Sequence, residues 1–387
     1  MSTKLRALRL PLLLGLLSGL FFYLARDPAS VGPGTPPQPA LSGKLAAVAQ
    51  TSTRSSAAAA ADLLPDLAEP GESLSEAQQR LARYKQFSRY PPGSRPAREH
   101  PDQMAPFLPV VRQSPLVFGG EANDEVSVQL GQDRRELVGD ETARLWVRCE
   151  DSLGKVLPCL VRQAVALPAP PTDSQVAPAP LTFLDDGQNG DDRSGDGTLT
   201  AALRPSALGF SGFSGTVRVQ LQIGLGEHRG GALFDLAYTP NAPARFAATV
   251  SETVVQGSLH LGLQIEVLRP GRYFVTGRVD DARERQFALV QWDGELTQGT
   301  HKVPLTVFGK LLHDEKPTFP LVLRDVVGFL FLDDSEPDRM HMPHLVGVVH
   351  KTKVYSLADF SEAEWDSEMK RRYLEEYEKD VERTKGR

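Results

Sequence analysis

Apolar and polar residues alternate with a period of two over much of the chain, the pattern of strands that bury one face. The alternation is strict at residues 126–130, 145–149 and 217–223. Turn residues separate these runs, which favours antiparallel strands packed face to face. We therefore predict a mainly β protein with two antiparallel β-sandwich units. One is immunoglobulin-like, over residues 107–240, and the other is jelly-roll-like, over residues 241–358.

The second unit is predicted from runs rich in β-branched and aromatic residues that end at Gly, Pro, Asp or Asn turns. Clear turns lie at residues 269–271 and 293–294. The expected strands cover residues 244–250, 258–268, 272–279, 287–292, 299–307 and 329–332.

The N-terminus has the pattern of an export signal. Lys4, Arg6 and Arg9 precede an almost wholly apolar run over residues 10–25. Basic residues ahead of such a run keep the start of the chain in the cytoplasm. The run ends in bulky residues, whereas a signal cleavage site needs small ones. We therefore predict an uncleaved signal anchor, a transmembrane helix over residues 1–26, with a cleaved signal peptide as the alternative.

Two segments of different composition follow the predicted anchor. Residues 27–72 are rich in Pro, Ala, Ser and Gly and contain no aromatic residue, so we predict a disordered linker that tethers the folded region. Residues 73–106 begin with a helical pattern in which Ser73 or Ser75 caps the first turn, and then become extended and proline-rich.

Residues 359–387 have the pattern of a C-terminal amphipathic α-helix. Ser361 and Glu364 have the spacing of a capping box. Apolar residues then recur every four positions. Two interpretations stay open, since such a stripe either docks onto the protein's own sheet or binds a partner protein. The candidate partner-binding residues are Trp365, Met369, Tyr373 and Tyr377, and Val381 continues the stripe.

The chain has two cysteines, Cys149 and Cys159, on either side of a predicted hairpin turn at residues 151–155. Cysteines on facing hairpin strands can meet disulfide geometry, and the bond forms in oxidising compartments. We predict a disulfide, with two independent buried thiols as the alternative. No histidine or further cysteine lies nearby in the sequence, so a zinc site at this pair is not expected.

Residues 185–197 form the most acidic segment, with five aspartates, one asparagine and four glycines in a single predicted loop. Carboxylates this close repel one another, and a hard cation with oxygen ligands would neutralise them. The spacing matches a calcium-binding loop in part. Asp, Asn and Gly also build long turns without metal, so a metal-free turn stays open. The predicted calcium ligands are Asp185, Asn189, Asp191 and Asp196.

Other candidate chemistry is weaker. His341, His344 and His350 lie near two aspartates, but their spacing matches no zinc pattern. We interpret them as surface or strand-end histidines. The Gly/Ser-rich segment at residues 209–215 lacks the register and the strand-turn-helix context of a nucleophile elbow. No catalytic centre and no organic cofactor are predicted, so we do not expect an enzyme.

Four segments have an order and spacing found in a known family. Residues 185–200 read Asp-Asp-Gly, then Asn-Gly-Asp, then Gly-Asp-Gly-Thr-Leu-Thr, and strand-like motifs follow at residues 271–279, 298–310 and 351–355. Together they resemble the choice-of-anchor X module of bacterial envelope and surface proteins, over residues 85–360. The resemblance implies an exported β-sandwich protein held at the envelope, without an assigned activity. An N-terminal anchor departs from the family's usual arrangement and favours the inner membrane over the cell surface.

The formal net charge of −6 and the lack of a basic stripe with interleaved aromatic residues oppose nucleic-acid binding. We expect a non-enzymatic binding or scaffolding protein, anchored in the bacterial inner membrane with most of the chain in the periplasm. Its expected partner is an envelope protein or glycan. The alternatives are a secreted or cell-surface protein after signal cleavage, an envelope hydrolase or accessory subunit acting on polysaccharide or peptide, and an assembly component that docks through its C-terminal helix.

Overall fold

The structure is a computed structural model that describes residues 73–386, apart from residues 119–120, 171–173 and 334. The predicted signal anchor and linker, residues 1–72, lie outside the described residues, and both stay predictions. Within the described part of the chain, no helix has the length and apolar character needed to cross a membrane.

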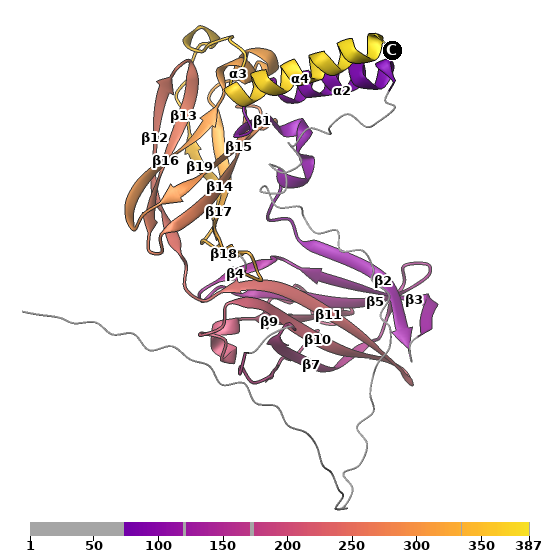
Figure 1. The fold of residues 1–387 in the computed structure, drawn as a ribbon. Helices are drawn as coiled ribbons and strands as arrows, with labels where there is room; N and C mark the ends of the chain where they lie inside the picture. The colour runs from indigo at the N-terminus through magenta and orange to yellow at the C-terminus, as the bar shows by residue number, and fades with distance from the viewer. Residues whose placement is uncertain (1–72, 119–120, 171–173, 334, 387) are drawn as a thin grey trace, which may run out of the picture. The chain divides into compact units, whose positions relative to one another are not determined.

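The fold is mainly β and antiparallel, as predicted (Figure 1). The largest sheet has ten strands in the order β6-β5-β3-β2-β11-β10-β7-β8, with β9 beside β5 and β4 beside β11. Its described strand pairs are antiparallel except for β4 and β11, which run parallel. The strands are β2 (Val110–Phe118), β3 (Glu121–Gln132), β4 (Glu136–Val138), β5 (Ala143–Asp151), β6 (Val156–Leu157), β7 (Leu160–Pro168), β8 (Ala179–Pro180), β9 (Thr198–Leu203), β10 (Gly215–Leu225) and β11 (His228–Thr239).

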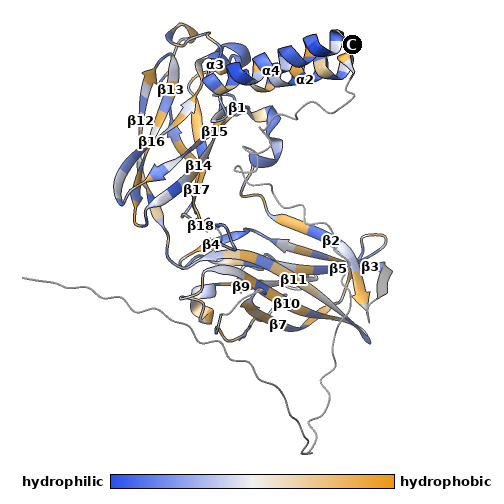
Figure 2. Cartoon of the chain, in the orientation of Figure 1, coloured by the Kyte–Doolittle hydropathy of each residue, from blue (hydrophilic) through white to orange (hydrophobic). Residues whose placement is uncertain are grey.

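The core of this sheet comes from alternate residues of its strands, which confirms the period-two pattern. In β5 the side chains of Leu145 and Val147 are fully buried, and in β10 those of Val217 and Val219 are. Each such aliphatic side chain contributes about 1.5–3 kcal/mol to folding relative to an exposed one. Figure 2 shows the resulting mixture of hydrophobic and hydrophilic residues along the strands.

Two further sheets share a second hydrophobic core. One has six strands in the order β1-β15-β14-β17-β18, with β19 beside β17, and the other has the order β12-β13-β16. Each of the six strands expected in this part of the chain overlaps an observed one. The strands are β1 (Ser94–Pro96), β12 (Ala244–Val255), β13 (Ser258–Val267), β14 (Gly271–Asp280), β15 (Gln286–Leu296), β16 (Gly299–Val307), β17 (Val322–Phe331), β18 (Arg339–His341) and β19 (Leu345–Lys351).

Strand β1 belongs to the second core, although it precedes the ten-stranded sheet in the sequence. It pairs with β15, and the Ser94 hydroxyl accepts a hydrogen bond from the Phe308 N–H at 2.9 Å. The segment at residues 73–106, predicted as a helix and an extended stretch, therefore supplies an edge strand of the six-stranded sheet. Three residues are too few to display a periodicity, so this pairing was not predicted.

The N-terminal helix of the folded region begins as predicted. Helix α2 (Leu74–Phe87) has Ser73 as its N-cap, and Ser73 and Glu76 form a capping box. The other described helices are α3 (Gly309–Glu315), α4 (Glu368–Lys385) and the short 3₁₀ turns η1 (Ala97–Glu99), η2 (Pro101–Gln103), η3 (Pro205–Leu208) and η4 (Leu357–Asp359).

Helix α4 does not begin at the predicted capping box, so that prediction is wrong. The Ser361 N–H donates a hydrogen bond to the Gly257 carbonyl at 2.9 Å, directly after Phe360, which is buried in the second core. These tertiary contacts keep the chain extended. The N-cap of α4 is Ser367, whose hydroxyl accepts a hydrogen bond from the Lys370 N–H.

The C-terminal helix packs on α2. A buried ion pair joins Arg80 of α2 to Asp380 of α4 at 2.8 Å, and Lys85 reaches Glu378 at 2.9 Å. Figure 2 shows α4 as mostly hydrophilic along its length. The narrow apolar stripe of α4 is therefore matched to one neighbouring helix rather than to a sheet.

Candidate functional site

Two groups of side chains in the described residues bring metal-ligating atoms within 4.8 Å of one another. We call residues 185–197 the acidic loop, in which Asp185, Asp191 and Asp196 meet. We call Glu136, His341 and His344 the histidine cluster. The two groups differ in how their polar atoms are satisfied.

Asp185 organises the acidic loop through backbone hydrogen bonds. Its Oδ1 accepts from the Gly195 N–H at 2.6 Å and the Asp196 N–H at 3.2 Å, and its Oδ2 accepts from the Gly197 N–H at 2.9 Å. Gly197 has a φ of +82° and leaves no room for a side chain, because an added Cβ would lie 2.3 Å from Val156 Cγ1. The end of the loop thus folds around one carboxylate.

The other two clustered carboxylates accept backbone donors as well. Asp191 Oδ2 accepts from the Gly187 N–H at 2.6 Å, and Asp196 Oδ1 accepts from the Thr198 N–H at 2.8 Å. Hydrogen bonds from backbone N–H groups to a charged acceptor are strong. The loop N–H groups therefore offset part of the carboxylate charge, which is the role predicted for a cation from the sequence.

The structure brings together three of the four predicted calcium ligands, Asp185, Asp191 and Asp196. Asn189, the fourth, is exposed and has a φ of 53°, a conformation that asparagine tolerates in turns. Calcium takes six to eight oxygen ligands. The calcium site therefore stays a prediction, which rests on three carboxylates that already accept hydrogen bonds.

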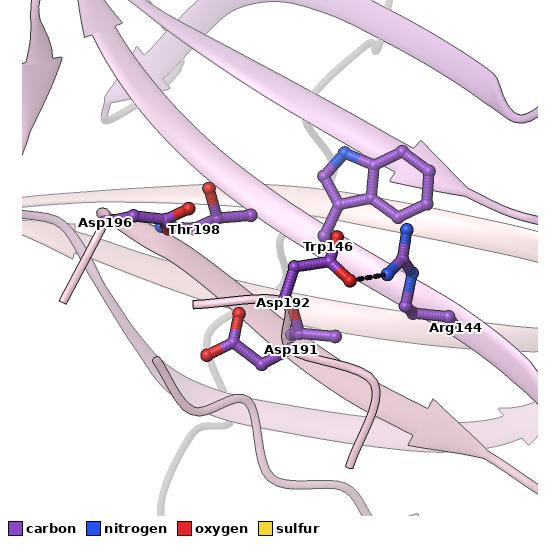
Figure 3. A pocket seen from close by; sticks show the side chains of 7 residues that line it. Arg144, Trp146, Asp191, Asp192, Asp196 and Thr198 are labelled. Atoms are coloured by element: carbon purple, nitrogen blue, oxygen red, sulfur yellow. Dashed lines mark hydrogen bonds and ion pairs between the residues drawn. The ribbon is translucent and has the colours of Figure 1, made fainter. Parts of the chain in front are cut away.

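A guanidinium group lies against the acidic loop (Figure 3). Arg144 Nη1 donates to the Gly190 carbonyl and to Asp192 Oδ1, both at 2.9 Å. Arg144 and Trp146 line a cavity of about 90 Å³ together with Asp191, Asp192, Asp196, Thr198 and Thr200. One positive charge thus already offsets the carboxylates on this side of the loop.

The members of the histidine cluster are positioned by different elements. Glu136 begins β4, which is held parallel to β11. His341 ends β18, and its backbone N–H donates to the Thr239 hydroxyl at 3.0 Å. His344 lies in the following segment, with its ring centroid 5.3 Å from that of Phe107.

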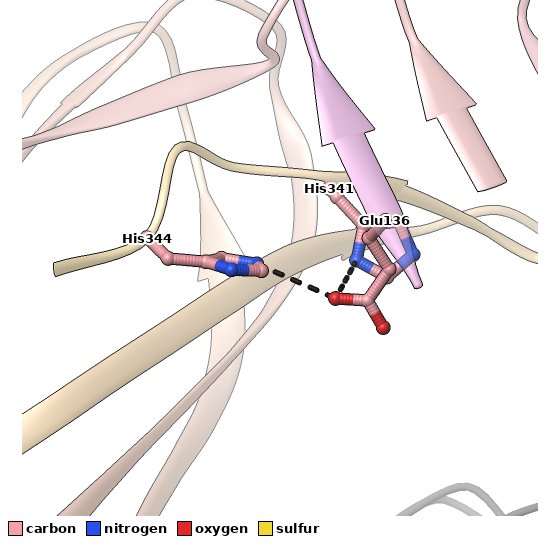
Figure 4. Close-up of side chains that lie close together, drawn as sticks. All are labelled: Glu136, His341 and His344. Atoms are coloured by element: carbon pink, nitrogen blue, oxygen red, sulfur yellow. Dashed lines mark ion pairs between the residues drawn. The ribbon is translucent and has the colours of Figure 1, made fainter. Parts of the chain in front are cut away.

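Both imidazoles approach the same carboxylate oxygen (Figure 4). Glu136 Oε2 lies 3.6 Å from His341 Nδ1 and 3.5 Å from His344 Nε2. These separations exceed the usual N–H···O hydrogen-bond length of about 2.7–3.2 Å. His344 Nε2 is also buried without a hydrogen-bond partner among the described residues. A buried unsatisfied polar atom costs about 1–3 kcal/mol of stability.

Burial keeps the histidines of the cluster neutral. It is the main cause of the lowered pKa of both His341 and His344. Glu136 opposes this effect, whereas Arg134 and Arg278 lower the pKa of His344 further. Burial also lowers the pKa of Arg278, to about 10. This value is still well above neutral pH, and Arg278 therefore stays cationic. A neutral imidazole is the form that binds metals.

Of the two predicted settings, surface or strand end, His341 has the second, because it ends β18 and its side chain is only 8% exposed. His350 is separate from this pair, because its Nε2 lies 2.8 Å from Glu252 Oε1 in the second core. The sequence contains no signal for the cluster, since Glu136 lies in a different predicted unit from His341 and His344. Only strand pairing brings the three together.

The predicted disulfide is confirmed. Cys149 and Cys159 are bonded, with a Cα–Cα distance of 6.0 Å, and both are buried. The Asp151 N–H donates to the Lys155 carbonyl at 2.9 Å, which closes the predicted hairpin turn. The bond covalently links β5 to the segment that leads into β7.

The four candidate partner-binding residues have different environments. Tyr373 and Tyr377 pack against Tyr84 of α2, with ring centroids 5.9 and 5.1 Å away. Met369 is 62% exposed, and Trp365 is partly buried ahead of the helix. The two tyrosines thus have an intramolecular partner, and binding of another protein by any of the four stays a prediction.

Comparisons with known proteins assign no family to the chain. No protein family and no curated protein matches the chain. A crystal structure of a DUF4785 family protein from Legionella pneumophila is similar, with 12% identity and a TM-score of 0.38. The match covers 60% of this chain and 58% of that one. A chimeric titin Z1Z2 carrying a decorin peptide matches with 12% identity and a TM-score of 0.19, over 63% of this chain and 99% of that one.

Proposed function

We propose that this is an exported, non-enzymatic protein of the bacterial envelope that binds or scaffolds an envelope protein or glycan. The observation that carries the proposal is the Cys149–Cys159 disulfide. Such bonds persist in oxidising compartments and are rare in the cytosol of most bacteria. Both cysteines of the chain are used in this one bond, which supports passage of the folded region out of the cytoplasm.

The fold supports a binding role rather than assigning a ligand. The sheets, mainly antiparallel, bury two hydrophobic cores, and β-sandwich architectures recur in many cell-surface proteins. The proposed membrane anchor is the transmembrane helix at residues 1–26, with the bulk of the chain in the periplasm. Membership of the choice-of-anchor X group belongs to the same proposal, as does calcium binding at the acidic loop.

The assembly alternative has less support. Tyr373 and Tyr377, two residues of the predicted docking stripe, pack against Tyr84 within the chain. A partner at this stripe would have to displace α2. The exposed Met369 offers too small an apolar surface to carry a protein interface alone.

Thiol accessibility tests the location of the folded region. The full chain is produced in a bacterial host, quenched rapidly in acid, and labelled with a maleimide before and after reduction. We expect no labelling of Cys149 and Cys159 before reduction and two labels per chain after it. We also expect the protein in the inner-membrane fraction, with sensitivity to protease added to spheroplasts. Free thiols in freshly quenched cells, with protection from external protease, would refute export.

A signal-exchange variant tests the anchor separately. Replacement of residues 1–26 by a cleavable signal peptide should release a soluble, disulfide-bonded protein into the periplasm. If the unaltered chain is already soluble in the periplasm, the anchor is wrong while export stands, and the secreted alternative applies.

A further inference from the structure

We propose that Glu136, His341 and His344 bind a divalent transition metal of the zinc class. The inference is independent of the proposed function, because it rests on the described side chains alone. Two imidazoles and one carboxylate are a ligand set that suits zinc and its first-row neighbours. Calcium and magnesium prefer all-oxygen sites, so this cluster selects a different class of ion from the acidic loop.

The distances fit a shared ion better than direct hydrogen bonds. Zinc–ligand bonds of about 2.0–2.1 Å in a tetrahedron place neighbouring ligand atoms about 3.3 Å apart. Glu136 Oε2 lies 3.6 Å from His341 Nδ1 and 3.5 Å from His344 Nε2. All three ligand atoms lie within 4.8 Å of one another. The two distances to Glu136 are therefore within a few tenths of an ångström of those in a tetrahedral site.

The unsatisfied nitrogen is the independent sign of a missing ligand. His344 Nε2 is buried and lacks a hydrogen-bond partner in the described residues. The nitrogen is directed at the carboxylate that His341 also approaches (Figure 4). Buried polar atoms are nearly always paired, so each exception requires an explanation such as an ion or a water. A metal at the centre of the cluster supplies the missing partner.

The surroundings hold the ligands in place. The backbone of His341 is fixed by pairing with Phe329 in β17 and by the hydrogen bond to Thr239. The ring of His344 lies beside that of Phe107. These contacts restrict the movement of both histidines.

The site has consequences for both sheets and for a fourth ligand. Glu136 belongs to the ten-stranded sheet and His341 to the six-stranded sheet, so one ion would cross-link them. Three protein ligands leave one tetrahedral position open for an exogenous ligand.

Zinc binding to the full chain tests the proposal. The purified protein is stripped with a chelator and titrated with Zn²⁺ in competition with a chromophoric chelator. We expect one tightly bound ion per chain. Loss of an outer-shell partner weakens metal affinity by about 10- to 100-fold. Glu136→Gln and His344→Gln each remove a direct ligand, so each should weaken binding at least tenfold.

Two matched controls separate this site from others. His350→Gln alters a histidine that also lies beside a carboxylate, at 2.8 Å from Glu252, but that belongs to neither metal-ligating group found in the described residues. Asp191→Ala alters the acidic loop. Both variants should bind Zn²⁺ as the unaltered chain does. Equal affinity in all four variants, or binding no tighter than that of exposed histidines, would overturn the proposal.

A spectroscopic measurement on the unaltered protein covers the case in which a variant does not fold. The X-ray absorption spectrum of the zinc-loaded chain should contain two imidazole ligands at about 2.0 Å and additional oxygen ligands. A first shell of oxygen alone, or with a single imidazole, would exclude the site.

Discussion

Residue types alone rank the acidic loop above the histidine cluster as a candidate metal site, and the hydrogen bonding in the structure reverses that order. Five aspartates crowd the loop, yet backbone N–H groups already donate to Asp185, and Arg144 donates to Asp192. The cluster has only three ligating side chains, but one of them presents a buried nitrogen without a partner. Metal affinity depends on which groups remain unsatisfied after folding as well as on the number of charged ligands.

The two regions also differ in the range of their contacts. The hydrogen bonds of Asp185 join residues that are ten to twelve positions apart. The cluster joins residues from separate sheets. The polar groups of a local loop can hydrogen-bond to one another as the loop folds. In a long-range cluster, the pairing of the strands decides which polar groups meet, whether or not they match.

The largest expected effect is on the loop. Asp185→Ala should lower the free energy of unfolding by about 3 kcal/mol, because three backbone donors lose a charged acceptor and hydration replaces it only in part. Urea unfolding at pH 7 measures this loss. Asp192→Ala is the control, since its carboxylate is 83% exposed and pairs with Arg144, and the change should stay below about 1 kcal/mol. Equal small losses would mean that the loop is not organised by its hydrogen bonds.

Asp281 lies outside the acidic loop, and its carboxylate, like that of Asp185, accepts hydrogen bonds from backbone N–H groups. Asp281 is 2% exposed and accepts from the N–H groups of Arg283 and Arg285. Burial raises its pKa, but the hydrogen bonds from Arg283, Arg285 and Thr318 outweigh burial, and the net pKa is lowered from 3.8. We expect Asp281→Asn to destabilise the protein at pH 7 by about 2 kcal/mol.

The effect of Asp281→Asn on stability should depend on pH. A carboxyl group with a lowered folded-state pKa stabilises the protein above its unfolded pKa, and that stability is lost as the pH falls through the folded value. The difference between the unaltered protein and Asp281→Asn should therefore shrink below about pH 4. Chemical unfolding at pH 7, 5 and 3 measures the trend. A difference that is constant across this range would show that the charge of Asp281 is irrelevant.

In the histidine cluster a substitution should stabilise the metal-free protein. His344→Phe keeps the ring beside Phe107 and removes the unsatisfied Nε2. In chelator we expect unfolding to require about 1 kcal/mol more than in the unaltered chain. Zn²⁺ should stabilise the unaltered chain and leave the variant unchanged. Destabilisation of the variant in chelator would indicate that Nε2 already has a partner.

The smallest expected effect is that of calcium on the acidic loop. A site with a dissociation constant of about 1 mM adds only about 0.4 kcal/mol at 1 mM calcium. Thermal melting in chelator and in 1 mM calcium should thus differ slightly, and Asp191→Ala with Asp196→Ala should remove the difference. A rise of several degrees in the melting temperature would instead indicate that the acidic loop binds calcium tightly.

Local patterns were sufficient for much of the fold. Strict alternation located β5 and β10, and the turn between Cys149 and Cys159 predicted a hairpin with a disulfide. The Ser73 cap was found because its hydrogen bonds stay within one helical turn. The capping box at Ser361 failed, since a contact with Gly257 prevents the helix from starting there.

The sequence by itself determined the mainly β class, the disulfide hairpin and the acidic loop as one local unit, because the pattern that reveals each of them lies within about a dozen consecutive residues. Only the tertiary structure decided that β1 joins the second core, that α4 packs on α2, and that Glu136 meets His341 and His344. The physical reason is that strand pairing and helix docking join distant residues through burial and backbone hydrogen bonds. Strand pairing leaves no periodic mark in the sequence when the strands are as short as β1, β4 and β18. The apolar stripe of α4 is periodic, but it does not identify the surface on which the helix packs.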